Sequence, residues 1–325
     1  MTSDMHGGVV NVPLPVARYR FRAQVQGELR LPPYAGSLLR GAFGAALRRV
    51  ACMTGLPACP ACPLYRTCPY PALFETPPQP TPLPQQFSQV PNPYVVEPPA
   101  SGTRRVPAGE TLEFHMVLIG HEALRQLPLV VHAWQRALAH GLGRMRVPAV
   151  LREVAWCSDE GHHEPVFEES DTRLHPHDAA LVVPAPPPGL TTLRLHIETP
   201  LRLQHQGHAL GPQRLDTRTL ILAAVRRATL MLHVHCGHDA APDMPSVLNA
   251  AASAVDDRAG LSWQDWTRYS SRQQQEMALG GVVGQWQLAG SALAAAWPWL
   301  WLGQWLHLGK NATMGLGAYR LSTDG

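Results

Sequence analysis

The sequence HLGKNATMGLGAY at residues 307–319 places three glycines, one lysine and two small polar residues in a single turn before a short apolar segment. Glycine lets the backbone come close to a ligand, and exposed backbone N–H groups bind anions. We therefore predict that a phosphate chain binds this turn. The predicted contacts are Gly309, Lys310, Asn311, Thr313, Gly315 and Gly317. The glycine spacing matches neither a Walker A loop nor a dinucleotide-binding fingerprint.

The residues that precede this turn alternate between strand and helix patterns. Hydrophobic spacing predicts strands at residues 193–197, 282–288 and 318–321, a long helix at 216–234 and a partly helical apolar segment at 291–305. Smaller helices are expected to begin at Ser246 and Ser262. The tryptophans at positions 297, 301 and 305 recur at helical spacing, which favours core packing over a platform for stacking bases.

The N-terminal half predicts the same order of elements. Strand patterns occupy residues 16–31, 110–120 and 147–157, and helix patterns occupy residues 122–140 and 37–52, with Ser37 as an N-cap. Strand, helix, strands, helix, strand therefore occurs twice, which indicates an α+β fold of two tandem ferredoxin-like domains. The length of 325 residues also exceeds the usual single-domain size. The proline-rich stretch at 184–189 predicts a boundary, with domains at residues 1–185 and 186–325.

The charge composition limits how the chain can bind nucleic acid. The formal net charge is +3 and only 16% of the residues are charged, so contacts must come from locally placed cations and not from a basic tail. The N-terminus has no secretory signal pattern. The apolar stretch 293–308 is interrupted by Pro298 and Gln304 and is shorter than the roughly 20 residues of a spanning helix. We therefore expect a soluble cytoplasmic protein with no membrane partner.

Four of the six cysteines lie close together, at Cys52, Cys59, Cys62 and Cys68. The central C-x-x-C can chelate a metal from one turn, and the outer thiols can complete a tetrahedral sulfur site. Zinc is the expected metal, an iron–sulfur cluster would use the same ligands, and reduced structural thiols are the remaining alternative. Four protein ligands leave no open coordination position, so the predicted site is structural and not catalytic.

Prolines crowd residues 76–100, directly after this cysteine cluster of residues 52–68. Proline removes a backbone donor and breaks both helices and sheet ladders. The stretch therefore predicts an extended surface linker.

Three stretches of the sequence resemble the RAMP superfamily of CRISPR-associated RNA-binding proteins, and most closely its precursor-crRNA processing endoribonucleases. They are residues 34–44 with the cysteines that follow, residues 268–273, and the glycine-rich turn. The resemblance implies tandem ferredoxin-like, RRM-related domains that bind CRISPR repeat RNA. It also implies cleavage by attack of a 2′-hydroxyl, which leaves a cyclic phosphate and needs no catalytic metal.

Such a reaction needs a base near the 2′-oxygen, an acid near the leaving 5′-oxygen, and cations around the phosphate. Relatives often place a catalytic histidine close to the first helix, but residues 37–52 contain none. We predict that His307 takes this role, because histidine is well suited to proton transfer near neutrality. Tyr34, Arg40 or Lys310 would support the proton transfers or the negative phosphate. The alternative is that His307 is a packed, hydrogen-bonded core residue.

Arg268, Tyr269 and Arg272 form a second predicted RNA contact. An aromatic side chain between guanidinium groups can stack on an unpaired base while the cations hold the adjacent phosphates. Helical spacing would bring the two arginines together. The alternative is a solvated helix face with one buried tyrosine.

These patterns support one leading function and two alternatives. The leading prediction is an endoribonuclease that matures CRISPR transcripts. The missing histidine in the first helix keeps open a non-cutting subunit that holds the crRNA end in an effector complex. CRISPR repeat RNA or crRNA is the partner in both cases, with effector subunits as further partners. An unrelated cysteine-cluster protein for protein contacts would have no affinity for RNA.

Overall fold

The structure is a computed structural model that describes residues 8–78, 90–99, 105–270 and 275–323. Internal contacts divide it into two compact units. The N-terminal unit comprises residues 14–181 and 234–237, and the C-terminal unit comprises the described residues up to Pro13, residues 182–233 and the described residues from His238 onward. β1 (Pro13–Leu14) and β9 (Leu181–Val182) fall at the changes from one unit to the other.

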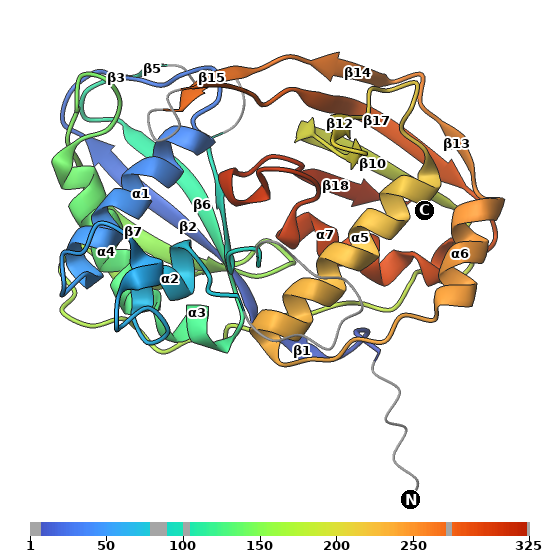
Figure 1. Cartoon of the computed structure of the whole chain (residues 1–325), viewed down its shortest axis with the longest axis horizontal. Coiled ribbons are helices and arrows are strands. Elements are labelled where there is room, and N and C mark those ends of the chain that lie inside the picture. The colour runs from blue at the N-terminus through green and yellow to red at the C-terminus, as the bar shows by residue number, and fades with distance from the viewer. Residues whose placement is uncertain (1–7, 79–89, 100–104, 271–274, 324–325) are drawn as a thin grey trace, which may run out of the picture. The chain divides into compact units, whose positions relative to one another are not determined.

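The N-terminal unit contains a five-stranded antiparallel sheet in the order β4-β6-β2-β7-β8. Figure 1 labels its three central strands, β6, β2 and β7. Its strands are β2 (Val16–Val25), β4 (Tyr94–Glu97), β6 (Thr111–Ile119), β7 (Ala149–Cys157) and β8 (His163–Glu168). The alternating sequence of β2 buries Tyr19, Phe21 and Ala23 on one face, because successive side chains of a strand point to opposite faces.

Two main helices of this unit, α1 (Gly36–Ala51) and α4 (Leu127–His140), pack against each other and contribute to the same core. The ring centroid of Trp134 lies 4.5 Å from that of Phe114 and 5.2 Å from that of Phe43, so one aromatic cluster joins both helices to the sheet. The shorter elements are β3 (Leu29–Arg30), β5 (Arg105–Val106), the 3-10 turn η1 (Cys59–Ala61), α2 (Pro69–Phe74) and α3 (His121–Arg125).

The C-terminal unit has a second five-stranded sheet, in the order β13-β17-β10-β18, with β14 also paired to β17. Its strands are β10 (Thr192–Leu201), β13 (Val255–Asp257), β14 (Leu261–Gln264), β17 (Gly281–Ala289) and β18 (Tyr319–Ser322). Two short hairpins are formed by β11 (Gln204–His205) with β12 (His208–Ala209) and by β15 (Thr267–Ser270) with β16 (Gln275–Ala278).

The core of this unit is closed by α5 (Thr217–Met231) and α7 (Trp297–Leu306), which pack against each other. Trp297, Trp301 and Trp305 are all buried, and the last two rings stack with centroids 4.3 Å apart, so the predicted core packing is confirmed. The remaining elements are the π-helical turn η2 (Leu232–Cys236), α6 (Met244–Ser253) and the 3-10 turns η3 (Leu293–Ala295) and η4 (Ala312–Met314). Across the described ranges, no helix is long and apolar enough to cross a membrane.

Both units follow the order strand, helix, two strands, helix, strand, which is the ferredoxin-like arrangement. In each sheet the first strand, β2 or β10, lies between the third and the fourth. The predicted tandem ferredoxin-like fold is therefore confirmed.

Three details of the sequence prediction are wrong. The helix expected from Ser262 is the strand β14, because its residues pair with β17. Residues 94–97, inside the predicted linker, form β4, which contains no proline and so keeps its donors for pairing with β6. α1 begins at Gly36, one residue before the expected cap Ser37, and Ala35 occupies the cap position without a side-chain bond.

Candidate functional site

The glycine-rich loop, residues 307–318, connects α7 to β18 and folds back onto the end of β10. The N–H of Lys310 donates to the carbonyl of Arg202 at 3.0 Å, and the N–H of Gly317 donates to the carbonyl of Pro200 at 3.1 Å. Both parts of the loop are therefore fixed to the end of β10 or to the residue that directly follows it.

Two glycines allow this close approach. Gly309 and Gly317 have φ angles of +83° and +72°, which side-chain-bearing residues rarely adopt. A Cβ at Gly309 would lie 2.6 Å from the carbonyl oxygen of Arg202, and one at Gly317 would lie 1.8 Å from that of Leu308. These glycines are thus required by the folding of the loop on itself, whether or not a ligand binds.

The prediction that the amides of Gly315 and Gly317 bind phosphate is not supported, because both residues are buried and both N–H groups already donate to carbonyls. Gly315 donates to Ala312 at 2.8 Å and Gly317 to Pro200. The carbonyl of Gly315 also accepts from the hydroxyl of Thr199 at 2.8 Å. This part of the loop stabilises the fold and does not present its N–H groups to an anion.

The accessible part of the loop lies at its beginning. Gly309 and Lys310 are exposed, and Asn311 and Thr313 are half-buried. The ammonium group of Lys310 is a compact cation that suits a phosphate. The ability of the loop to bind an anion therefore depends on Lys310 and the polar side chains beside it.

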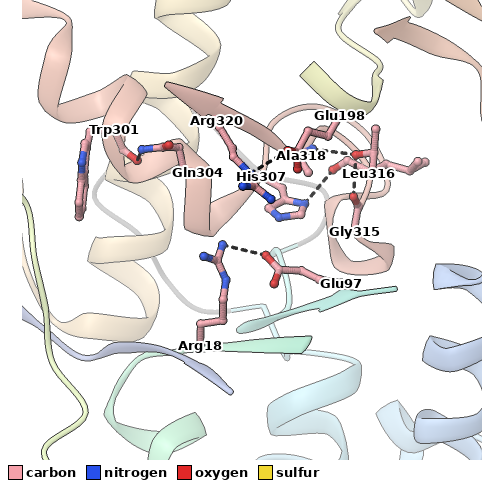
Figure 2. Close-up of polar contacts among 11 residues, drawn as sticks. Arg18, Glu97, Glu198, Trp301, Gln304, His307, Gly315, Leu316, Ala318 and Arg320 are labelled. Carbon is pink, nitrogen blue, oxygen red and sulfur yellow. Dashed lines mark hydrogen bonds and ion pairs between the residues drawn. The ribbon is translucent and has the colours of Figure 1, made fainter. Parts of the chain in front are cut away.

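His307 lies at the base of the loop and is 1% exposed. Its Nδ1 lies 3.3 Å from the carbonyl oxygen of Leu316 and points toward it (Figure 2). Because a carbonyl only accepts, Nδ1 carries the proton in this contact. The backbone of His307 has φ 52° and ψ 151°, a conformation that costs about 1–3 kcal/mol in residues other than glycine. The structure thus favours the alternative of a packed, hydrogen-bonded core histidine over a ring that is open to substrate.

Side chains from other elements hold the end of α7 that leads into His307. Arg227 of α5 donates from Nε and Nη2 to the carbonyl of Leu306, at 3.3 and 3.1 Å. Burial lowers the pKa of Arg227 to about 10, so it stays cationic near neutrality, where it also complements the negative end of the helix dipole. The hydroxyl of Tyr319 donates to the carbonyl of Leu300 at 2.5 Å.

Tyr34 and Arg40 lie in the N-terminal unit, whereas His307 lies in the C-terminal unit. Burial, with a smaller contribution from the Glu97 carboxylate, raises the pKa of Tyr34 well above its ordinary value. The hydroxyl therefore stays protonated near neutrality and can donate a hydrogen bond but not act as a base. The guanidinium carbon of Arg40 lies 4.3 Å from the centroid of the Phe74 ring, in a cation–π contact.

Arg268 and Tyr269 lie on β15, so their predicted helical spacing is wrong. β15 pairs with β16, placing Arg268 opposite Met277 and Tyr269 opposite Glu276. The cross-strand pairing outweighs the local spacing on which the helix was predicted. Arg272 and the side chains of the hairpin lie outside the described residues.

The four clustered cysteines line one small cavity in the N-terminal unit, together with side chains that include Thr54 and Tyr65. The sulfur of Cys62 lies 3.3 Å from the hydroxyl of Thr54. Among the described residues, however, no group of three or more His, Cys, Asp or Glu side chains is arranged to hold a metal ion. The predicted zinc or iron–sulfur site at Cys52, Cys59, Cys62 and Cys68 is therefore not supported by the arrangement of the thiols, and all six cysteines are free.

Two family models match the chain. Residues 195–319 match the model described as CRISPR-associated endoribonuclease Cas6, and residues 14–179 match a model described as an N-terminal domain. No curated protein sequence matches the chain.

Solved structures with a similar fold include several Cas6 proteins. A Cas6 product complex has a TM-score of 0.56 and 15% identity, over 94% of this chain and 99% of that one. Thermus thermophilus Cas6 has a TM-score of 0.52 and 13% identity, over 96% of this chain and 99% of that one. A partial Cas6-RT-Cas1–Cas2 complex has a TM-score of 0.54 and 15% identity, over 97% of this chain and 47% of that one. At such identities the likeness establishes the fold alone.

Two ferredoxin-like units in tandem form the fold that this chain shares with these Cas6 structures, and the second unit has a glycine-rich loop between its last helix and its last strand. The chain carries, at residues 195–319, a domain that matches the Cas6 family of CRISPR-associated endoribonucleases. It is accordingly an RNA-binding enzyme that cleaves CRISPR repeat RNA.

Proposed function

We propose that the protein matures precursor crRNA by a metal-independent reaction in which a 2′-hydroxyl of the repeat attacks the adjacent phosphate. The 2′-oxygen forms a bond to phosphorus and loses its proton, the bond to the 5′-oxygen breaks, and that oxygen gains a proton. The products are a 2′,3′-cyclic phosphate and a 5′-hydroxyl. The observation that carries this proposal is the exposed Lys310, held on a loop fixed to β10 in the part of the chain that matches Cas6.

The donor chemistry of the loop supports a reaction without a catalytic metal. Residues 307–318 contain no aspartate or glutamate, and carboxylates are the usual protein ligands of Mg²⁺ at phosphates. A lysine cation can instead stabilise the negative charge that develops on the phosphate. Lys310 is the charged side chain of the loop that is placed to do so.

The RNA contacts proposed for the C-terminal unit fall into two groups. Gly309, Lys310, Asn311 and Thr313 contact the phosphate chain, while Gly315 and Gly317 keep the loop in shape. The hairpin that carries Arg268, Tyr269 and Arg272 contacts an unpaired base and its neighbouring phosphates, since an aromatic residue and arginines suit both.

The proposed roles of the remaining site residues follow from their burial. His307 is a positioning residue that fixes the loop through Leu316, because a ring that is 1% exposed is poorly placed to take a proton from RNA. Tyr34 donates a hydrogen bond to the RNA, which its raised pKa supports. Arg40 supplies positive charge near the phosphate chain.

A structural zinc ion at Cys52, Cys59, Cys62 and Cys68 remains a separate proposal. It is supported by the close spacing of the four cysteines in the sequence and by the suitability of four thiolates for zinc. Such an ion would tie the end of α1 to the start of α2 and would take no part in catalysis. None of the six cysteines, all of which lie in the described ranges, forms a disulfide, which suits a reducing compartment, so we place the protein in the cytoplasm, where it passes crRNA to effector subunits.

Incubation of the purified protein with repeat RNA in excess EDTA tests the function. We expect one specific cut and a 2′,3′-cyclic phosphate on the upstream product, identified by mass spectrometry. Intact RNA in EDTA with cleavage restored by Mg²⁺ would refute the metal-independent mechanism. Tight binding without cleavage under either condition would instead indicate a non-cutting subunit.

A further inference from the structure

A pair of exposed histidines lies on the hairpin formed by β11 and β12. His205 is directly opposite His208 in this antiparallel pair. The turn between them consists of Gln206 and Gly207, with φ angles of +49° and +82°, the signs of a tight type I′ turn. Directly opposed residues have Cβ atoms about 4.5–5.5 Å apart on one face of the pair, so both side chains start from neighbouring points on that face.

The hairpin begins beside the glycine-rich loop. The carbonyl of Arg202 accepts the N–H of Lys310 at 3.0 Å. His205 follows Arg202 by three residues, which places their Cα atoms within about 11 Å of each other. Residues 202–211 and 307–318 contain no aspartate or glutamate, so an anion that binds there meets no carboxylate from either segment.

The hairpin supplies the accessible acid and base that the proposed reaction otherwise lacks. The cleavage needs a base and an acid that can touch the RNA, but α1 contains no histidine and His307 is buried. His205 and His208 are both exposed, and both belong to the unit that carries Lys310. A short hairpin closed by a two-residue turn also keeps the two residues opposite each other before RNA binds.

We propose that His205 and His208 are the acid–base pair of the cleavage reaction, with Lys310 holding the scissile phosphate. This inference rests on the proposed function. One imidazole, in its neutral form, takes the proton of the 2′-hydroxyl as the 2′-oxygen bonds to phosphorus. The other, in its protonated form, gives a proton to the 5′-oxygen as the bond from phosphorus to that oxygen breaks.

Single-turnover cleavage of repeat RNA by the full-length protein tests the pair. His205→Ala and His208→Ala are each expected to slow cleavage by about 100- to 10,000-fold, the usual contribution of a positioned acid or base, while the Kd for RNA changes by a few fold. Imidazole in the buffer should restore part of the rate. A substrate with sulfur in place of the scissile 5′-oxygen should restore the variant that lacks the acid, because a thiolate leaves without protonation. His162→Ala, at an exposed histidine of the N-terminal unit, is the matched control and should cleave at the wild-type rate.

The outcomes separate this inference from the proposed function. Wild-type rates in both single variants would overturn the acid–base pair and leave the proposed function standing. Slow variants that neither imidazole nor the sulfur substrate restores would also overturn proton transfer by the pair. If the wild-type protein itself leaves repeat RNA intact in EDTA, the proposed function fails first. Melting curves show whether each variant is folded, and surface substitutions of this kind should leave the melting temperature nearly unchanged.

Discussion

Replacement of His307 distinguishes a positioning role from proton transfer. Nδ1 of this buried ring donates to the carbonyl of Leu316. The side-chain amide of His307→Asn keeps an N–H donor near the position of Nδ1, whereas His307→Ala removes the donor. If His307 fixes the loop, the asparagine variant should cleave repeat RNA nearly as fast as the wild type and the alanine variant should be slower.

The size of the alanine effect follows from the burial of the contact. Leaving a buried carbonyl unpaired costs about 1–3 kcal/mol. If displacement of the loop carries this whole cost, cleavage should fall by about 5- to 150-fold, since about 1.4 kcal/mol corresponds to a tenfold change in rate. Loss of the ring also leaves a void, so the free energy of unfolding should decrease more for alanine than for asparagine.

Single-turnover cleavage at saturating protein measures the effect, with melting curves and RNA titrations as controls. Both variants should bind RNA and unfold cooperatively. An asparagine variant that is folded, binds RNA and is as slow as the alanine variant would show that the imidazole itself transfers a proton. The inference from burial would then be wrong.

Three further predictions concern the lysine of the loop and the cysteines. Lys310→Ala should weaken RNA binding and reduce the slope of log Kd against log salt concentration by about one, since one phosphate contact is lost, whereas Lys310→Arg should keep the slope. An unchanged slope in a salt titration of the alanine variant would contradict the contact. Cys59→Ser combined with Cys62→Ser should lower the melting temperature and abolish bound zinc, whereas wild-type protein with no zinc and the same melting temperature as the variant would disprove the zinc proposal. Burial raises the pKa of the Cys157 thiol to about 11, so its reactive thiolate is scarce at pH 7.5 and increases as the pH rises toward that value. Hydrogen bonds, chiefly from the backbone of the following turn, lower the pKa of Cys52. Mass spectrometry of the chelator-treated protein should therefore find Cys52 alkylated before Cys157 at pH 7.5. The reverse order would refute this account.

The order of strands and helices could be predicted because each unit builds its core from residues at regular spacing. The alternation in β2 and the tryptophans of α7 are local signals that remain valid in the folded protein. β14 could not be predicted in the same way. Its strand conformation depends on pairing with β17, which begins 17 residues after β14 ends, and the local spacing from Ser262 resembles a helix.

The position of the functional loop could also be predicted from the sequence, but the direction of its amide groups could not. Glycines at 309, 315 and 317 predict a tight turn, and the structure contains one. The carbonyls that occupy the N–H groups of Lys310 and Gly317 come from Arg202 and Pro200, more than 100 residues away in the sequence. The His205–His208 hairpin did have a local signal, because Gln206-Gly207 between two short polar segments is compatible with a two-residue turn.

Neither compact unit is a continuous stretch of polypeptide, which bears on how the protein is made. In the C-terminal unit the N–H of Asn11 donates to the carbonyl of Val183 at 2.8 Å, and in the N-terminal unit a ring nitrogen of His235 lies 2.7 Å from the carbonyl of Pro91. During synthesis on the ribosome, the N–H of Asn11 therefore cannot form this hydrogen bond until more than half of the chain has emerged. Two fragments cut between residues 181 and 182 would each carry a piece that belongs to the other, so separate expression of the halves would yield two incomplete domains.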